Sequence, residues 1–268
     1  MLRNVFRKSL WEQRRALLWW TLGIVGFVAI TIAFFPSLKG SASELQDYLE
    51  QLPESLRNLF VGTETDITSP IGYLNSQVFA GNGAIVFLVF AIGAGARAIA
   101  GEEEKGTLEL LLATPVTRRT VVLQKFWAMT VALAALALVL YVMLIATGRP
   151  VGLTVSPVDL LAATVHQYVF ALGFGAIALA IGCLRGRKGL AIGLTTSIAV
   201  VAFLLNGLAP LADATAWMRF VSPFYYANGS IPLRNGFAPD HLALLVAIVV
   251  VAAVGAVWAF ERRDLAIG

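Results

Sequence analysis

The stretch Gly101–Thr107 is where the sequence comes nearest to a nucleotide-binding motif. It reads G-E-E-E-K-G-T, whereas a phosphate-binding loop, G-x-x-x-x-G-K-[ST], carries a lysine after its second glycine. Thr107 stands in the place of that lysine, and Glu102, Glu103 and Glu104 would repel a phosphate group. We therefore expect this stretch to bind no nucleotide and the chain to hold no cofactor of its own.

Few other side chains have the chemistry of a catalytic or metal site. The chain has one cysteine, Cys183, and two histidines, His166 and His241, which are too few for a metal centre. It contains neither H-E-x-x-H nor G-x-S-x-G, so an intramembrane hydrolase is disfavoured. His166, Gln167 and Asn206 lie within apolar runs, where polar groups are costly without a partner. They are candidates for a substrate pathway, with hydrogen bonding between helices as the alternative.

Composition indicates a membrane protein. Of the 268 residues, 58% are hydrophobic and 13% charged, and the mean hydropathy is +0.79. Six apolar runs are long enough to cross roughly 30 Å of hydrocarbon at about 1.5 Å per residue. They are expected at about Ala16–Phe35, Val78–Ala100, Val121–Ala146, Asp159–Leu184, Leu190–Leu211 and His241–Phe260. The predicted fold is an all-α polytopic membrane protein in which residues 1–268 form a single transmembrane domain.

The basic residues predict the orientation of these spans. With the N-terminus inside, only five of the 20 lysines and arginines fall outside: Lys39, Arg57, Arg149, Arg219 and Arg234. This excess of basic residues on the inside predicts that both termini are cytoplasmic. The net charge of +4 is then explained by cytoplasmic loops beside anionic lipid, and no nucleic-acid partner is expected.

Residues 1–15, before the first span, predict an interfacial helix. Its apolar face carries Leu2, Val5, Phe6 and Leu10, and its basic face includes Arg3 and Arg7. Such a helix lies in the membrane surface, with a generic basic flank as the alternative. The apolar run that follows is longer than the roughly 7–15 residues of a signal-peptide core, which favours a retained first span over a cleaved signal peptide.

Two outer loops carry signals of their own. Ser43 and Gln46 form a capping box, and Pro53 can begin a second short helix in the first loop. In the last loop, aromatic residues gather around Pro223 and predict two short half-inserted helices or an interfacial belt. They are Trp217, Phe220, Phe224, Tyr225 and Tyr226.

Small residues predict close helix contacts in two spans. Ala91 and Gly95 in the second span, and Gly189 and Gly193 in the fifth, recur at the four-residue spacing that lets helix backbones approach. We expect these two spans to meet a second copy of the chain.

The loop between the second and third spans predicts a contact site for a cytoplasmic partner. Leu108, Leu111 and Leu112 recur at helical spacing and predict a short amphipathic helix. Thr114 is expected to cap the following helix, with Pro115 in its first position. An amphipathic helix held between two spans can serve as a binding site for a soluble protein.

The residues of this loop resemble those of ABC-2 type permeases, the membrane subunits of ATP-binding-cassette exporters. The family pattern E-x-x-x-G-T-L-E-L-L-L-x-x-P-[VI]-x-R is met by Glu102, Gly106, Thr107, Glu109, Pro115 and Arg118. The stretches L-P-E-S-L-R-N-L-F, S-P-F-Y-Y and E-R-R-D-L also fit the family. The resemblance therefore covers nearly the whole chain.

The resemblance implies a transport subunit and not an enzyme. In the family, the loop over residues 101–114 is a coupling helix that docks on a separate cytoplasmic ATPase, which binds ATP and Mg. Two ATPases and a second permease, either the same chain or a close paralogue, complete an exporter in the plasma membrane of a prokaryotic cell. The residues implied at the ATPase contact are Glu102, Glu103, Glu104, Gly106, Thr107, Leu108, Glu109, Leu111 and Leu112. A nucleotide-independent secondary transporter is the alternative, although no internal repeat supports it.

Overall fold

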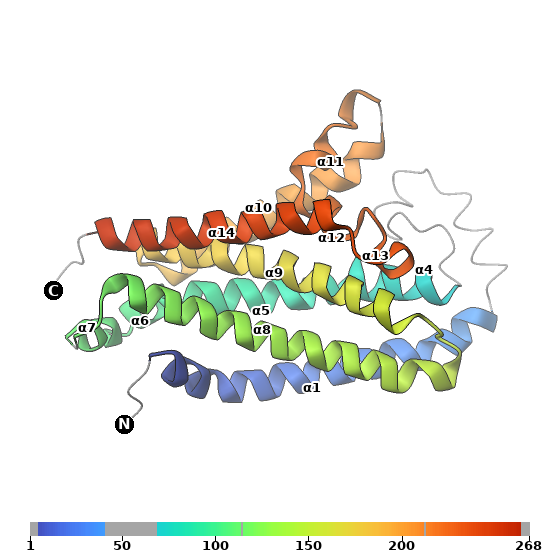
Figure 1. Cartoon of the computed structure of the whole chain (residues 1–268), viewed down its shortest axis with the longest axis horizontal. Helices are drawn as coiled ribbons and strands as arrows, with labels where there is room; N and C mark the ends of the chain where they lie inside the picture. The colour runs from blue at the N-terminus through green and yellow to red at the C-terminus, as the bar shows by residue number, and fades with distance from the viewer. Residues whose placement is uncertain (1–4, 41–68, 114, 212, 264–268) are drawn as a thin grey trace.

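Six long helices form most of the molecule (Figure 1). The computed structural model describes residues 5–40, 69–113, 115–211 and 213–263, and within these ranges it contains no strand. The six helices are α1 (Val5–Gly40), α5 (Asn82–Ala98), α8 (Arg118–Gly148), α9 (Pro157–Arg185), α10 (Lys188–Leu208) and α14 (Pro239–Arg262). Each belongs to a helical stretch long and apolar enough to cross a membrane, so the predicted all-α fold with six spans is confirmed.

Two short helices, α6 (Ala100–Glu103) and α7 (Thr107–Leu112), lie at one end of the bundle together with the start of α1 and the end of α14 (Figure 1). We call this the α7 end. The opposite end carries α13 (Pro232–Asn235), and we call it the α13 end.

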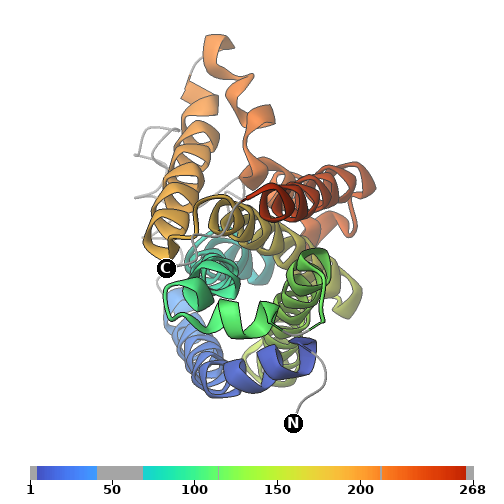
Figure 2. The same cartoon turned by 90° about the vertical axis from the view of Figure 1, so that its left-hand side faces the viewer.

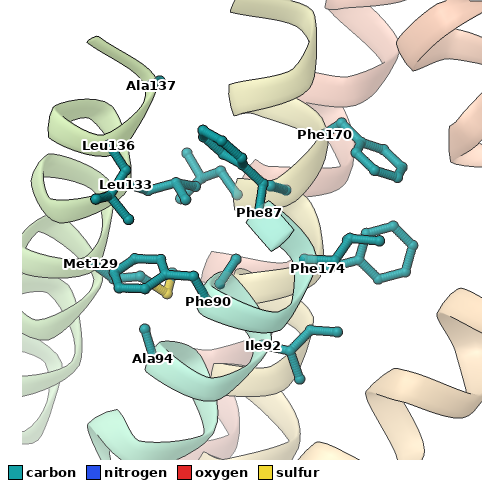
Figure 3. Close-up of a cluster of buried hydrophobic side chains, with 14 of the residues drawn as sticks. Phe87, Phe90, Ile92, Ala94, Met129, Leu133, Leu136, Ala137, Phe170 and Phe174 are labelled. Atoms are coloured by element: carbon teal, nitrogen blue, oxygen red, sulfur yellow. The ribbon is translucent and has the colours of Figure 1, made fainter. Parts of the chain in front are cut away.

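The helix α9 lies in the middle of the bundle and packs against α5, α8, α10 and α14. Met129 and Leu133 of α8 face Phe90 of α5 in the core, and Phe170 and Phe174 project from α9 (Figure 3). Because polar groups are nearly absent from this region, van der Waals packing between the helices holds it together.

The small residues of the second span serve contacts within the chain. Ala91 and Gly95 are buried against α9, and a Cβ atom at Gly95 would collide with the carbonyl oxygen of Gly175. The predicted close helix contact is therefore present, but its partner is α9 of the same chain. Gly189 and Gly193 of α10 differ, since the space beside each of them is open.

The second span begins earlier than predicted. A short helix, α4 (Pro70–Leu74), and a π-helical turn, η1 (Asn75–Phe79), precede α5. Ser69 caps α4, because its hydroxyl oxygen accepts a hydrogen bond from the backbone N–H of Gly72 at 3.0 Å. Gly81 separates η1 from α5 at a point where a Cβ atom would strike the carbonyl of Ser76. The apolar run alone did not indicate this break.

The N-terminal segment is continuous with the first span. The helix α1 runs without interruption from Val5, and its first turns cross the end of the bundle (Figure 2). Val5 is buried, and the backbone N–H of Phe6 donates to the side-chain oxygen of Gln124 in α8 at 3.0 Å. This part of the helix is therefore docked on α8. Leu2 and Arg3 lie outside the described residues.

The helix of the third span begins at Arg118, later than the start predicted at Pro115. Thr117, and not Thr114, caps α8, because its hydroxyl oxygen accepts a hydrogen bond from the backbone N–H of Thr120 at 3.3 Å. Pro115 precedes the helix, so its predicted place as the first helical residue is wrong. Thr114 itself lies outside the described residues. A threonine nearer the apolar run supplied the cap instead.

The segment after α10 turns back toward the bundle. It contains α11 (Met218–Val221), α12 (Pro223–Asn228) and α13. Between α11 and α12, the buried hydroxyl of Ser222 donates to the carbonyl of Ala202 in α10 at 2.7 Å. The ring of Phe224 lies 4.7 Å from that of Phe170 in α9. Short helices are thus present as predicted for the aromatic loop. The helices expected around Ser43 and Pro53 fall outside the described residues.

Candidate functional site

The loop that resembled a nucleotide site consists of α6 and α7 joined by a turn. Gly106 has a φ of 68°, a left-handed conformation that glycine adopts without steric cost. The hydroxyl of Thr107 donates to the carbonyl of Glu102 at 3.1 Å and ties the start of α7 to α6. The short amphipathic helix predicted over the three leucines is α7, and a further short helix, α6, precedes it. The Gly-Thr pair of the motif forms the junction between them.

The three consecutive glutamates attach this loop to three different places. Glu102 forms an ion pair with Lys125 of α8, and Glu103 forms one with Arg263, just beyond α14. A carboxylate oxygen of Glu104 accepts a hydrogen bond from the backbone N–H of Lys188, the first residue of α10, at 2.7 Å. Because successive residues of a helix point in directions about 100° apart, each carboxylate reaches a different neighbour. The loop is thereby joined to the ends of several spans.

Arg263 is the centre of a further set of contacts at the α7 end. Its guanidinium donates to Glu103 and, at 3.2 Å, to the carbonyl of Cys183 in α9. In turn, the guanidinium of Arg118 donates to the carbonyl of Arg263. Gly186 ends α9 with a φ of 66°, and a Cβ atom there would collide with both members of the Glu103–Arg263 pair. The ends of α9 and α14 are therefore fixed to the loop.

The apolar face of α7 packs on its own bundle. Leu108 is 1% exposed and belongs to the core, while Leu111 and Leu112 are half-buried. The leucine that projects into solvent is Leu110, which is 74% exposed. The sequence-based expectation placed Leu108 in the contact with a partner, whereas the structure has it inside the chain.

The exposed surface of the loop is small and combines charged with apolar residues. We call it the exposed loop face, and it consists of Glu104, Lys105, Gly106, Glu109, Leu110 and Ala113. Glu102 and Glu103 are partly buried by their ion pairs, so of the expected contact residues Glu104, Gly106 and Glu109 lie on this face. Lys105, Leu110 and Ala113 were missed because helical spacing alone did not show which side of α7 faces the bundle.

A long groove lies between α5 and α10 and reaches α12. Its volume is about 1110 Å³, and most of its wall is apolar. Asn206, one of the candidate pathway residues, lines this groove near the end of α10. Arg97, near the end of α5, also lines it and was not among the residues selected from the sequence. A cation at the end of an apolar run was the signal that could have indicated it.

Comparison with known proteins identifies the family. The sequence matches the family model of the ABC-2 family transporter proteins over residues 3–265. The chain belongs to this family. No curated protein matches it.

Membership of the ABC-2 transporter family defines the general role of the chain. It is a multi-pass membrane protein and a permease subunit of an ABC transporter, and the family implies association with an ABC ATPase subunit. The resemblance noted in the loop is confirmed.

The other candidate pathway residues of this ABC-2 transporter lie in the interior. His166 and Gln167 are buried in α9 and do not line the groove that contains Asn206. The imidazole of His166 is bonded through Nδ1 to the carbonyl of Ala162 at 2.8 Å, whereas the amide of Gln167 has no hydrogen-bond partner. Asn75 in η1, which sequence reasoning missed, has a buried and equally unpaired amide. The structure therefore does not bring the three predicted residues into one site.

Proposed function

We propose that this ABC-2 transporter forms the substrate pathway of an ABC exporter and that a separate ATPase subunit drives it by docking on the exposed loop face. In this proposal the α7 end is cytoplasmic, both termini are cytoplasmic, and the protein lies in the plasma membrane of a prokaryotic cell. ATP and Mg are held by two ATPase subunits. The outward direction of transport follows from the resemblance of the loop to exporter permeases.

The observation that carries the proposal is the way α7 is held. Its apolar side is fixed to the core by Leu108, and the preceding carboxylates attach it to Lys125 of α8 and to Arg263 beyond α14. A force on α7 is therefore transmitted to several spans at once. Alternating access needs two arrangements of the spans that a partner favours to different degrees, and a loop fixed in this way supplies the mechanical link.

Leu110 is the best candidate for the centre of the docking contact. It is the most exposed apolar side chain of α7, and Lys105 and Glu109 are exposed in the same loop. An apolar anchor surrounded by polar residues is the usual arrangement of an energetically important contact between proteins. The residues around it favour a partner surface with an apolar pocket and charges of both signs.

A second permease completes the proposed transporter. The outer face of α10 supports this, because Val201 is exposed and the space beside Gly189 and Gly193 is open. Small residues let helices of two chains approach closely within a membrane. The second subunit is then the same chain or a close paralogue.

Two leucines of α7 test the docking proposal. Leu110→Asp should leave membrane levels and thermal stability unchanged but prevent the ATPase from remaining bound during purification. A loss of about 2 kcal/mol, typical of an important interface residue, corresponds to roughly 30-fold weaker binding. Leu108→Asp is the matched control, because it places a charge in the core of the chain and should lower the unfolding temperature.

The proposal fails if Leu110→Asp keeps the ATPase and retains normal ATP-dependent transport. Transport that continues with an ion gradient and without any ATPase would instead favour a secondary transporter.

A further inference from the structure

The groove between α5 and α10 extends along nearly the whole of α5. One face of α5 lines it from Asn82 to Arg97, which corresponds to roughly 22 Å of helix at about 1.5 Å per residue. Its volume of about 1110 Å³ exceeds the roughly 300–1,000 Å³ of a typical small-molecule site. Leu88 and Ile92 contribute to the wall from α5, and Phe203 from α10. The groove therefore suits a long molecule with a large apolar part.

Arg97 gives this apolar groove a positive charge at the α7 end. Side chains of a helix tilt toward its N-terminus, which for α5 is the direction of the membrane interior. The guanidinium does lie one turn back along the helix, since Nη1 is 3.6 Å from the Cβ position of Gly93. Glycine leaves this space open. The charge is thus placed beside the groove.

Arg97 has no acidic partner among the residues that the structure describes. The carboxylates nearest in sequence are Glu102, Glu103 and Glu104, and each is bonded elsewhere. Arg97 is exposed at the mouth of the groove, so an anion bound there would gain a charge-assisted hydrogen bond.

A second cation, Lys188, lies near Arg97 but is not among the residues that line the groove. Lys188 begins α10, and its Cδ atom is 3.8 Å from the Cβ position of Gly101. The Cγ atom of Arg97 is 3.6 Å from that same position. The two basic side chains therefore flank one glycine, one from each helix that forms the groove. The guanidinium of Arg97 lies toward Gly93, whereas Glu104 accepts a hydrogen bond from the backbone N–H of Lys188. Arg97 is therefore the cation that faces the groove at this end.

The other end of the groove differs in chemistry. Arg219 also lines it, but its guanidinium lies over the rings of Phe220 and Tyr225, at 4.7 Å and 5.6 Å from their centres. The guanidinium of Arg219 is therefore already engaged in cation–π contacts. Asn206 and Asn228 add neutral polar groups at this end. The charge pattern therefore indicates an occupant with its acidic group at the α7 end.

We propose that this groove binds a single anionic amphiphile of the phospholipid type, with its acidic headgroup at Arg97 and its hydrocarbon part along α5 and α10. The inference rests on the proposed export function, because it makes this amphiphile the transported substrate. With the α7 end in the cytoplasm, the molecule enters from the inner leaflet of the membrane.

Lipid binding to the purified full-length chain tests this proposal. Native mass spectrometry measures binding of dioleoylphosphatidylglycerol, which is anionic, and of dioleoylphosphatidylethanolamine, which has no net charge. The anionic lipid should bind more tightly. Arg97→Gln should weaken its binding about tenfold, as expected for loss of one charge-assisted contact, and Arg97→Lys should restore most of it.

Two further variants complete the experiment. Arg119→Gln removes an exposed charge from the start of α8, outside the groove, and should change nothing. Gly93→Leu fills the space beside the guanidinium and should weaken the binding of both lipids. If both lipids bind equally, or if Arg119→Gln weakens binding as much as Arg97→Gln, the site is only a general basic surface and the proposal is wrong.

The transport part of the inference is measured in the assembled complex with the ATPase. Phosphatidylglycerol should raise ATP hydrolysis, and Arg97→Gln should remove that rise. Binding without stimulation would show a resident lipid and would overturn the assignment as substrate. Lipid binding is measured on the chain without the ATPase. A negative result would therefore contradict the lipid proposal and leave the proposal of ATPase docking at Leu110 unaffected.

Discussion

The ion pair between Glu102 and Lys125 should contribute strongly to stability because both side chains are largely removed from water. The Lys125 side chain is 4% exposed and that of Glu102 is 14% exposed. Lys125→Met keeps most of the side-chain length and removes only the charge. Glu102 would then be a carboxylate without a counter-charge, and its second oxygen is already buried without a hydrogen-bond partner.

The expected loss of stability follows from this burial. Removing one partner of a buried ion pair costs about 3–5 kcal/mol, and the residual exposure of Glu102 favours the lower figure. For a chain of this size, 1 kcal/mol corresponds to roughly 2–4 °C, so the unfolding temperature should fall by about 6–12 °C. Thermal unfolding of the purified chain, followed by tryptophan fluorescence, measures the shift.

Two variants make this experiment specific. Lys105→Met removes an exposed lysine from the same loop and should leave the unfolding temperature unchanged. The double variant Glu102→Gln with Lys125→Met buries no charge, so it should regain most of the lost stability. The reasoning is refuted if Lys125→Met unfolds at the wild-type temperature, or if the double variant is no more stable than the single one.

Three further predictions concern helix packing. Gly95→Ala should lower the unfolding temperature because its Cβ atom would meet the backbone of α9, whereas the control Gly93→Ala meets only the flexible end of Arg97 and should be tolerated. Val5→Asp should reach the membrane but show reduced stability and transport, since Val5 is buried; unchanged activity would make the start of α1 a simple flank. Gly193→Cys on a Cys183→Ser background should cross-link two copies, and monomers alone at every position tried along α10, with the ATPase present, would end the dimer proposal.

The spans were predictable from the sequence because each satisfies a single physical requirement. A run such as Val121–Ala146 must be helical and about as long as the hydrocarbon is thick, and α8 is indeed Arg118–Gly148. The exact ends were less predictable, since several residues compete to cap a helix. The cap of α8 is Thr117, where Thr114 was expected. The break at Gly81 depends on its close approach to the carbonyl of Ser76, which no local sequence pattern indicates.

The functional loop was predictable in position but not in orientation. The motif around Glu102 indicated the family, and the leucines indicated an amphipathic helix. Whether the apolar side of α7 faces a partner or its own bundle depends on which helices lie beneath it, and sequence spacing does not carry that information. The partners of Glu103 and Glu104 are 160 and 84 residues away, at Arg263 and Lys188, so only the assembled bundle reveals these contacts.

The contacts of Arg263 also have a consequence for synthesis and assembly. Ribosomes make this residue after all six spans, yet it holds Glu103 and the carbonyl of Cys183. During translation the loop after the second span therefore remains without this attachment until the last helix has been inserted. In the proposed orientation, an incomplete chain would present α7 to the cytoplasm without this attachment. Under the proposed docking of the ATPase on this loop, recognition of the attached loop would let the ATPase distinguish finished permeases from nascent ones.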